Sequence, residues 1–293
     1  MPSARPSPIR LNAYVLAADP AYLAASVRAY YDRVDRIVVS YDRSSTSWSG
    51  TPLPVEECLG IIKDLDVAGK CEYVPGDYYR ADHEPLDNDT HQRQAALDRA
   101  SDGADWVLQL DTDEVLAAPA TFFAAIGRAH DVGATALDYP ARWLYARVGD
   151  APSGGRYLEA STRFWRPVAG YPGPLAVRPG TTLTCARQAD AAIHHRVDLR
   201  ARNTDPAHGP DTIVHEVIGL DEAVVHYSWV RDDADMRRKF GWSGHSAAYS
   251  RPEVYRRWAS RARRPRRAVL TTPLRRHPEW FRLSTIAPEA RRA

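Results

Sequence analysis

The first 115 residues alternate between apolar runs and amphipathic segments, and this alternation most narrows the folds open to the chain. Four short apolar, β-rich runs are expected to be strands: residues 13–17, 36–40, 71–74 and 106–110. Three segments with apolar side chains at helical spacing are expected to be helices: residues 23–31, 55–65 and 90–100. Such alternation is typical of an α/β fold with a parallel sheet and helices on both faces.

Aspartates follow three of these runs. Asp19 follows the first run, Asp42 the second, and Asp111 and Asp113 the last. Ligands of open α/β sheets bind beyond the carboxyl ends of the strands. We therefore expect the four carboxylates to converge on one site. Thr90 is expected to cap the helix that precedes the last run.

The spacing of Asp111 and Asp113 predicts a metal site. Residues i and i+2 of an extended segment point to the same side, so the two carboxylates would lie together. Carboxylate ligands suit Mg²⁺ or Mn²⁺, which keep coordination positions for water and phosphates. Either cofactor would neutralise charge on a departing diphosphate. The alternative is a solvated acidic turn.

Two adjacent segments carry a resemblance to a known family. Residues 91–100 read HQRQAALDRA, and residues 105–116 read DWVLQLDTDEVL. They resemble GT-A nucleotide-sugar glycosyltransferases of the family 2 type, in which an arginine-bearing helix precedes a strand and an Asp-x-Asp-Glu motif. Residues 38–45, VVSYDRSS, fit that family's second strand and loop. The resemblance covers about residues 11–118 and implies a GT-A (Rossmann-like) mixed sheet with helices on both faces.

The resemblance also implies roles for individual residues. Asp42 would face the base of the nucleotide, and Asp19 would lie near the base or ribose. Arg93 would lie near the nucleotide and help to hold Asp111. Asp111 would face the ribose, or the metal through water, and Asp113 would be the direct metal ligand.

The second half contributes further candidates. Residues 223–229 form another apolar run, and it contains His226. Many GT-A enzymes use a downstream histidine as a metal ligand, so His226 is a candidate; the alternative is a core histidine bonded to backbone. Lys239 and Arg231 follow, and either could reach a diphosphate. For Lys239 the alternative is a solvated helix face. Helices are expected at about residues 232–247 and 251–262.

The catalytic base and the acceptor site are the least specified features. An inverting transferase needs a group that accepts the proton of the acceptor hydroxyl. Five residues beyond the Asp-x-Asp motif qualify, of which the two glutamates are our candidates: Glu159, Glu216, Asp211, His194 and His195. Four aromatic residues would either stack on the acceptor or belong to the core: Trp143, Tyr145, Trp165 and Tyr171.

Charge and composition divide the chain into four expected parts. They are a flexible N-terminus (1–10), a nucleotide-sugar-binding half (11–118), an acceptor-binding half (119–248) and an arginine-rich helical tail (249–293).

The net charge is +2, but residues 251–293 carry +10 and leave −8 for the rest. The tail would attract an anionic membrane or the acidic body of the chain. No nucleic-acid fold signature accompanies it, so no specific nucleic acid is expected.

The composition also excludes several classes of protein. No apolar run reaches the roughly 18 residues of a transmembrane helix. The N-terminal residues MPSARPSPIR lack the apolar region of a secretory signal. The three cysteines are widely spaced and form neither a disulfide framework nor a zinc motif. We expect a reducing, cytoplasmic location.

These expectations combine into one function and two alternatives. The function is a metal-dependent glycosyltransferase (hexosyltransferase class) that moves a sugar from a nucleoside diphosphate sugar to an acceptor hydroxyl, with inversion. One alternative is a haloacid-dehalogenase-type phosphatase that uses Asp111 and Asp113. The order of elements argues against it, since that motif should follow the first strand. The other alternative is a non-catalytic protein that binds anionic surfaces.

Overall fold

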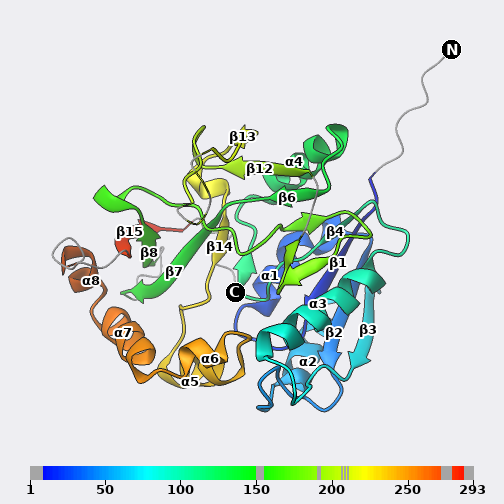
Figure 1. Cartoon of the computed structure of the whole chain (residues 1–293), viewed down its shortest axis with the longest axis horizontal. Helices are drawn as coiled ribbons and strands as arrows, with labels where there is room; N and C mark the ends of the chain where they lie inside the picture. The colour runs from blue at the N-terminus through cyan, green and yellow to red at the C-terminus, as the bar shows by residue number, and fades with distance from the viewer. Residues whose placement is uncertain are drawn as a thin grey trace.

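An eight-stranded mixed sheet forms the centre of the computed structural model, which describes residues 9–149, 155–189, 193–205, 207, 209, 211–271 and 279–286 (Figure 1). Its strands, in spatial order, are β13 (Glu216–Val217), β12 (His194–Asp198), β6 (Ala136–Asp138), β9 (Ala176–Val177), β4 (Trp106–Leu108), β1 (Leu11–Leu16), β2 (Arg36–Asp42) and β3 (Cys71–Gly76). Strands β1 to β4 are parallel, and β9 runs antiparallel to its neighbours β4 and β6. The parallel sheet predicted for the first half is confirmed.

Helices cover both faces of this sheet, as the α/β prediction requires. They are α1 (Leu23–Tyr30), α2 (Val55–Leu65) and α4 (Pro119–Asp131) on one face, and α3 (Pro85–Ala100) on the other. Side chains of β1 alternate between these layers, because successive residues of a strand point to opposite faces. Ala13 and Val15 pack with α1, α2 and α4, whereas Tyr14 and Leu16 pack with α3.

A second, five-stranded sheet adjoins the first. In spatial order it contains β15 (Trp280–Thr285), β8 (Arg156–Ser161), β7 (Ala141–Val148), β14 (Val224–His226) and β5 (Glu114–Val115). The chain passes from β4 of the first sheet to β5 of the second through residues 109–113, so the Asp-x-Asp segment lies where the sheets meet. Strand β14 pairs with β5 and places His226 opposite Glu114.

The remaining elements flank the second sheet and the edge of the first. They are a hairpin of β10 (Leu183–Cys185) and β11 (Gln188–Ala189), the helices α5 (Asp233–Trp242), α6 (Ser246–Tyr249), α7 (Pro252–Arg263) and α8 (Pro265–Thr271), and the 3-10 turns η1 (Tyr31–Arg33), η2 (Arg163–Trp165) and η3 (Leu220–Glu222). Figure 1 shows α7, α8, β8 and β15 together at one end of the molecule.

Three local predictions differ from the structure. Helix α3 begins at Pro85, with proline in its first turn, and Thr90 lies inside it, where its Oγ1 donates to the carbonyl of Leu86. The helix expected over residues 232–247 is two helices, α5 and α6, separated at residues 243–245. The tail contains the expected helices, but also the unpredicted strand β15, which pairs with β8.

Some expectations concern parts of the chain that are only partly described. The predicted flexible segment 1–10 lies outside the described residues, except for Ile9 and Arg10, and so do residues 272–278 and 287–293 of the tail. Within the described ranges, no helix combines the length and apolar character needed to cross a membrane. Cys58, Cys71 and Cys185 are all free thiols.

Candidate active site

A cavity of about 200 Å³ lies beyond the carboxyl ends of β1 and β4. Its walls come from the ends of these strands, from α3, and from the segment that runs from α5 to α6. The sequence candidates that line it are Asp19, Arg93, Asp111, Asp113, Trp143, His226 and Lys239. The structure thus brings residues from both halves of the chain to one hollow.

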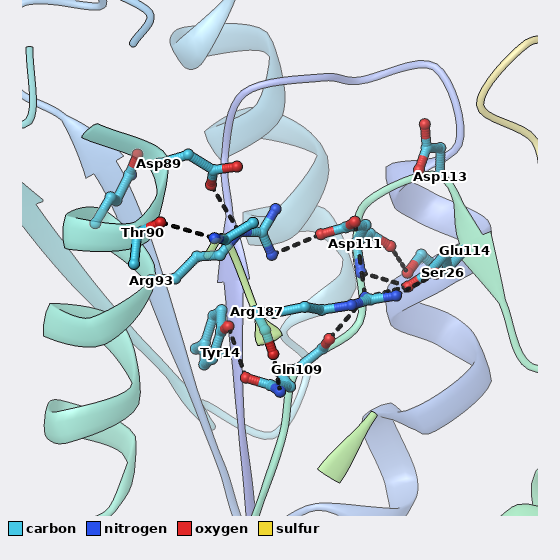
Figure 2. Close-up of polar contacts among 12 residues, drawn as sticks. Tyr14, Ser26, Asp89, Thr90, Arg93, Gln109, Asp111, Asp113, Glu114 and Arg187 are labelled. Carbon is cyan, nitrogen blue, oxygen red and sulfur yellow. Dashed lines mark hydrogen bonds and ion pairs between the residues drawn. The ribbon is translucent and has the colours of Figure 1, made fainter. Parts of the chain in front are cut away.

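Asp111 is held by two arginines (Figure 2). Its Oδ1 lies 2.7 Å from Nη1 of Arg93, and its Oδ2 lies 3.7 Å from Nη1 of Arg187. Arg93 also donates from Nε to Oδ1 of Asp89, 2.6 Å away and one helical turn earlier on α3. Burial alone would raise the pKa of Asp111, but the guanidinium groups of Arg93 and Arg187 outweigh it and lower the pKa to about 2.

Arg187 also forms a buried, two-pronged ion pair with Glu114. Its two terminal nitrogens lie 2.5 Å from Oε2 and Oε1 of Glu114, and both side chains are 1% exposed or less. Arg187 donates further to the carbonyl of Gln109, while Glu114 accepts the backbone N–H of Asp111 at 3.0 Å. Hydrogen bonds of this kind offset part of the desolvation cost of a buried charge pair. The pair thereby fixes both ends of the Asp-x-Asp turn.

Residues 111–114 form a turn, in which the backbone N–H of Glu114 donates to the carbonyl of Asp111. The two aspartates therefore do not point together as an extended segment would arrange them. Figure 2 shows Asp113 on the far side of the turn from Arg93 and Arg187. Among the described residues, no group of three or more His, Cys, Asp and Glu is arranged to hold a metal. The metal role expected of Asp111, Asp113 and His226 stays a prediction.

Asp113 has a separate set of cationic partners. Its Oδ1 lies 3.2 Å from Nε2 of His226. Its Oδ2 accepts from Nζ of Lys239 at 2.5 Å and from Nη2 of Arg231 at 3.1 Å. Arg231 also reaches Oδ2 of Asp19 at 2.5 Å. Burial would raise the pKa of Asp113, but Lys239, His226 and Arg231 hold it well below its usual range.

His226 lies close to Asp113 and Glu114, the last two residues of the Asp-x-Asp-Glu motif. Its Nδ1 is 3.8 Å from Oε1 of Glu114 and has no hydrogen-bond partner among the described atoms. Its ring meets that of Trp143 edge-on, with centroids 4.7 Å apart. The histidine is therefore oriented toward the motif by strand pairing and by an aromatic neighbour, and it does not bond to backbone.

Asp42 is occupied within its own loop. Its Oδ1 accepts the backbone N–H groups of Ser44 and Thr46, and its Oδ2 accepts that of Tyr78, each at 3.0 Å. Three charge-assisted bonds of this kind shape a loop and leave little of the carboxylate for a ligand. Asp42 is also absent from the described lining of the cavity.

The two glutamates chosen as catalytic bases lie outside the cavity lining. Glu159 on β8 is buried and bonds to Arg142 at 2.8 and 3.2 Å. Glu216 on β13, at the edge of the large sheet, pairs with Arg128 and lies 3.4 Å from Nε2 of His195. Both carboxylates therefore stabilise the fold through cationic partners, and the structure does not bring them to the other candidates.

The remaining candidates are also dispersed. His194 lies 3.1 Å from the carboxylate of Asp138, and Asp211 is exposed on a loop. Tyr145 stacks on Trp229, and the hydroxyl of Tyr171 donates to a backbone carbonyl of β12. Trp165 is exposed on η2. Of the four candidate aromatics, Trp143 lines the cavity.

Sequence reasoning missed several residues of the site. The main ones are Asp89, Trp48, Arg187, Trp242 and His245, which line the cavity. A carboxylate that follows a buried strand, as Glu114 does, signals that a cationic partner exists. Nothing in the spacing identifies that partner as Arg187, which reaches the motif from the turn between β10 and β11.

Comparisons with known proteins give little beyond these observations. No family profile and no curated protein matches the chain. One similar solved structure is 4-diphosphocytidyl-2C-methyl-D-erythritol synthase from Anaerococcus prevotii DSM 20548, with 14% identity, a TM-score of 0.34, and coverage of 58% of this chain and 71% of that one. Another is CMP:2-keto-3-deoxy-manno-octonic acid synthetase complexed with CTP, with 14% identity, a TM-score of 0.30, and coverage of 58% and 74%. At these values the likeness does not extend to activity.

The buried pair gives a first prediction. Arg187→Met leaves Glu114 buried and unpaired, so the free energy of unfolding should fall by about 3–5 kcal/mol. The double variant Arg187→Met/Glu114→Gln should recover much of this loss in urea denaturation. The control is Arg99→Met, which breaks a solvent-screened pair with Glu72 and should lower the unfolding free energy far less. A loss at Arg187 no larger than the control would contradict the role given to the pair.

The pKa of Asp111 gives a second prediction. The pKa of Asp111 in the folded protein, about 2, lies below the ordinary value of about 3.9. The ion pairs of Asp111 therefore stabilise the fold fully above about pH 3.9, and this stabilisation is lost as the pH falls toward 2. Asp111→Asn should therefore show a smaller drop in unfolding free energy between pH 5 and pH 3 than the parent protein. Asp98→Asn, at an exposed position of α3, is the matched control. Parallel profiles for Asp111→Asn and the parent would rule the coupling out.

Proposed function

We propose that the protein is a glycosyltransferase that moves a sugar from a nucleoside diphosphate sugar to an acceptor hydroxyl, with inversion by direct displacement. The observation that carries the proposal is the pair of carboxylates, Asp111 and Asp113, on one turn beyond β4, facing a cavity together with Lys239. The position beyond parallel strands suits a nucleotide. The local cations suit a diphosphate.

The two carboxylates have different parts in this proposal. Asp111 is bound by arginines that belong to α3 and to the β10–β11 turn, and it acts as a fixed anchor of the site. Asp113 is bound by Lys239, which α5 carries at the cavity wall. A flexible ammonium group can exchange one anionic oxygen for another, so Lys239 would bind the diphosphate when the donor enters.

The pair Asp113 and His226 fits a divalent cation. Ligand atoms at right angles, each about 2.1 Å from Mg²⁺, lie about 3 Å apart, close to the 3.2 Å between Oδ1 and Nε2. The Nδ1 of His226 lies 3.8 Å from Oε1 of Glu114, too far for a hydrogen bond, although the second nitrogen of a metal-ligating histidine usually donates to such a carboxylate. Mn²⁺ or Mg²⁺ bound there would supply positive charge to the leaving diphosphate.

The donor's nucleoside would occupy the cavity beside Asp19. Its wall there includes the aromatic rings of Trp48 and Trp242, which offer apolar surface to a base or ribose. Arg93 contributes indirectly, because its guanidinium is engaged by Asp89 and Asp111. Asp42 has no direct part in donor binding in this proposal, because its carboxylate is bonded to its own loop.

We propose Asp89 as the proton acceptor, in place of Glu159 and Glu216. Burial raises the pKa of Asp89 even though Arg93 opposes the shift, whereas the pKa values of Asp111 and Asp113 are lowered. A carboxylate with a raised pKa is the stronger base. Gly244 faces its Oδ2, and a Cβ at that position would lie 3.0 Å from the oxygen. A side chain at residue 244 would therefore crowd this oxygen.

The phosphatase alternative gains no support from the geometry. A phosphatase nucleophile must be free to attack phosphorus, whereas Asp111 lies in contact with two arginines. Its turn follows β4, not the first strand of the chain.

The proposal also includes a reducing, cytoplasmic location, with which free cysteines are compatible.

The test is a panel of nucleoside diphosphate sugars with Mn²⁺ and Mg²⁺, with release of nucleoside diphosphate as the readout. We expect metal-dependent release with at least one donor. Asp113→Asn should reduce it by at least about a hundredfold, because a neutral amide holds neither the cation nor Lys239 as firmly. Asp98→Asn is the matched control. Circular dichroism should show that both variants fold.

Two results would contradict the proposal. One is full turnover by Asp113→Asn, which would remove this carboxylate from the reaction. The other is a panel in which no donor is bound or hydrolysed in the presence of either metal ion.

A further inference from the structure

A second arginine-rich hollow lies apart from the candidate active site. It has a volume of about 550 Å³ and shares no lining residue with the first cavity. Its walls are the loop around η2 and residues 200–204, which follow β12. It contains four arginines: Arg163, Arg166, Arg200 and Arg202.

These arginines are exposed and uncompensated. Among the described residues, none of the four guanidinium groups has a carboxylate within ion-pair distance. The nearby carboxylate of Asp198 is turned inward, where it accepts from Thr204 and from the backbone of Leu199. Four like charges around one hollow repel each other and attract an anionic partner.

Exposed aromatic side chains project beside the arginines. Phe164 is 65% exposed and Trp165 is 45% exposed, at the tip of η2. Trp280 on β15 lies next to both, with ring centroids 6.5 and 6.0 Å away. Large aromatics beside arginine are the composition of protein surfaces that sit at the headgroup level of a membrane.

The loop holds its aromatic tip outward in a defined conformation. The backbone N–H of Thr162 donates to the carbonyl of Arg166 at 2.9 Å, and Ser161 pairs with Pro167. Phe164 and Trp165 both have positive φ, 67° and 57°, a region that side chains with a Cβ rarely adopt. Backbone strain of this kind persists only where the surrounding structure holds it in place.

The same end of the molecule carries the arginine-rich tail. Helix α8 packs against β15 from the face opposite Trp280, through Ala268 and Val269 around Phe281. Helix α8, with its exposed arginines, therefore lies on the face of the edge strand opposite Trp280. Their charge would draw this end toward an anionic surface over a longer range.

We propose that η2, Trp280 and the four arginines form a docking surface for an anionic phospholipid membrane. The lipid phosphates would occupy the arginine hollow, and the rings of Phe164 and Trp165 would enter the headgroup region. This membrane contact is distinct from the one expected of the arginine-rich tail. Apart from Trp280, the residues that form it lie outside residues 249–293. It does not depend on the proposed activity.

The test is co-sedimentation of the full chain with vesicles of phosphatidylcholine alone or with phosphatidylglycerol at roughly one third. We expect binding to the mixed vesicles only, since each arginine near an anionic surface contributes on the order of a factor of five. Arg163→Gln/Arg166→Gln and Phe164→Ser/Trp165→Ser should each weaken it about tenfold or more. Arg256→Gln/Arg257→Gln, which removes exposed charges of α7, is the matched control and should weaken it less.

Other outcomes would overturn this proposal. They are equal binding to neutral vesicles, loss of binding in the α7 control but not in the η2 variants, or preferential binding of single-stranded RNA at the same surface. Because the η2 variants lie outside the first cavity, their release of nucleoside diphosphate in solution should equal that of the parent protein. This readout separates a failure of docking from a failure of the proposed function.

Discussion

The carboxylates of Asp111, Asp113 and Glu114 beyond β4 are largely removed from solvent and require compensating cations, and the architecture around the cavity follows from this constraint. Arg187 meets Glu114 and Asp111 from a hairpin of the second half, and Arg93 meets Asp111 from α3. Removing any one partner would leave a charge in a low-dielectric setting. The ion pairs therefore couple the two halves of the chain at the place where the two sheets join.

The arrangement also separates a rigid group from an exchangeable one. Of the partners of Asp111, Arg93 is held by α3 and Arg187 by its buried bonds to Glu114 and Gln109. Asp113 shares its partner Arg231 with Asp19. Its partner Lys239 lies at the cavity wall, where the long side chain can change partner. One turn thus presents Asp111 with fixed partners and, two residues later, Asp113 with one partner on a long, flexible side chain. This division is what the proposed transfer reaction uses.

Much of the first half was predictable from the sequence, because its strands and helices are long enough for their periodicity to show. The second half was less so, since strands such as β5, β9 and β13 have two residues each and depend on distant partners. At the site, the grouping of Asp19, Asp113 and His226 followed from strand ends and from family resemblance. The turn at residues 111–114, Arg187 and the buried pairing of Glu159 depend on tertiary contacts that no local pattern encodes.

The most direct test of the account is a crystal structure with a nucleoside diphosphate and Mn²⁺, chosen by affinity from uridine, guanosine, cytidine and thymidine diphosphates. The account predicts the diphosphate in the cavity, with Nζ of Lys239 on a phosphate oxygen and Asp111 still bound by Arg93. A nucleotide bound elsewhere, or bound while Lys239 stays on Asp113, would contradict it.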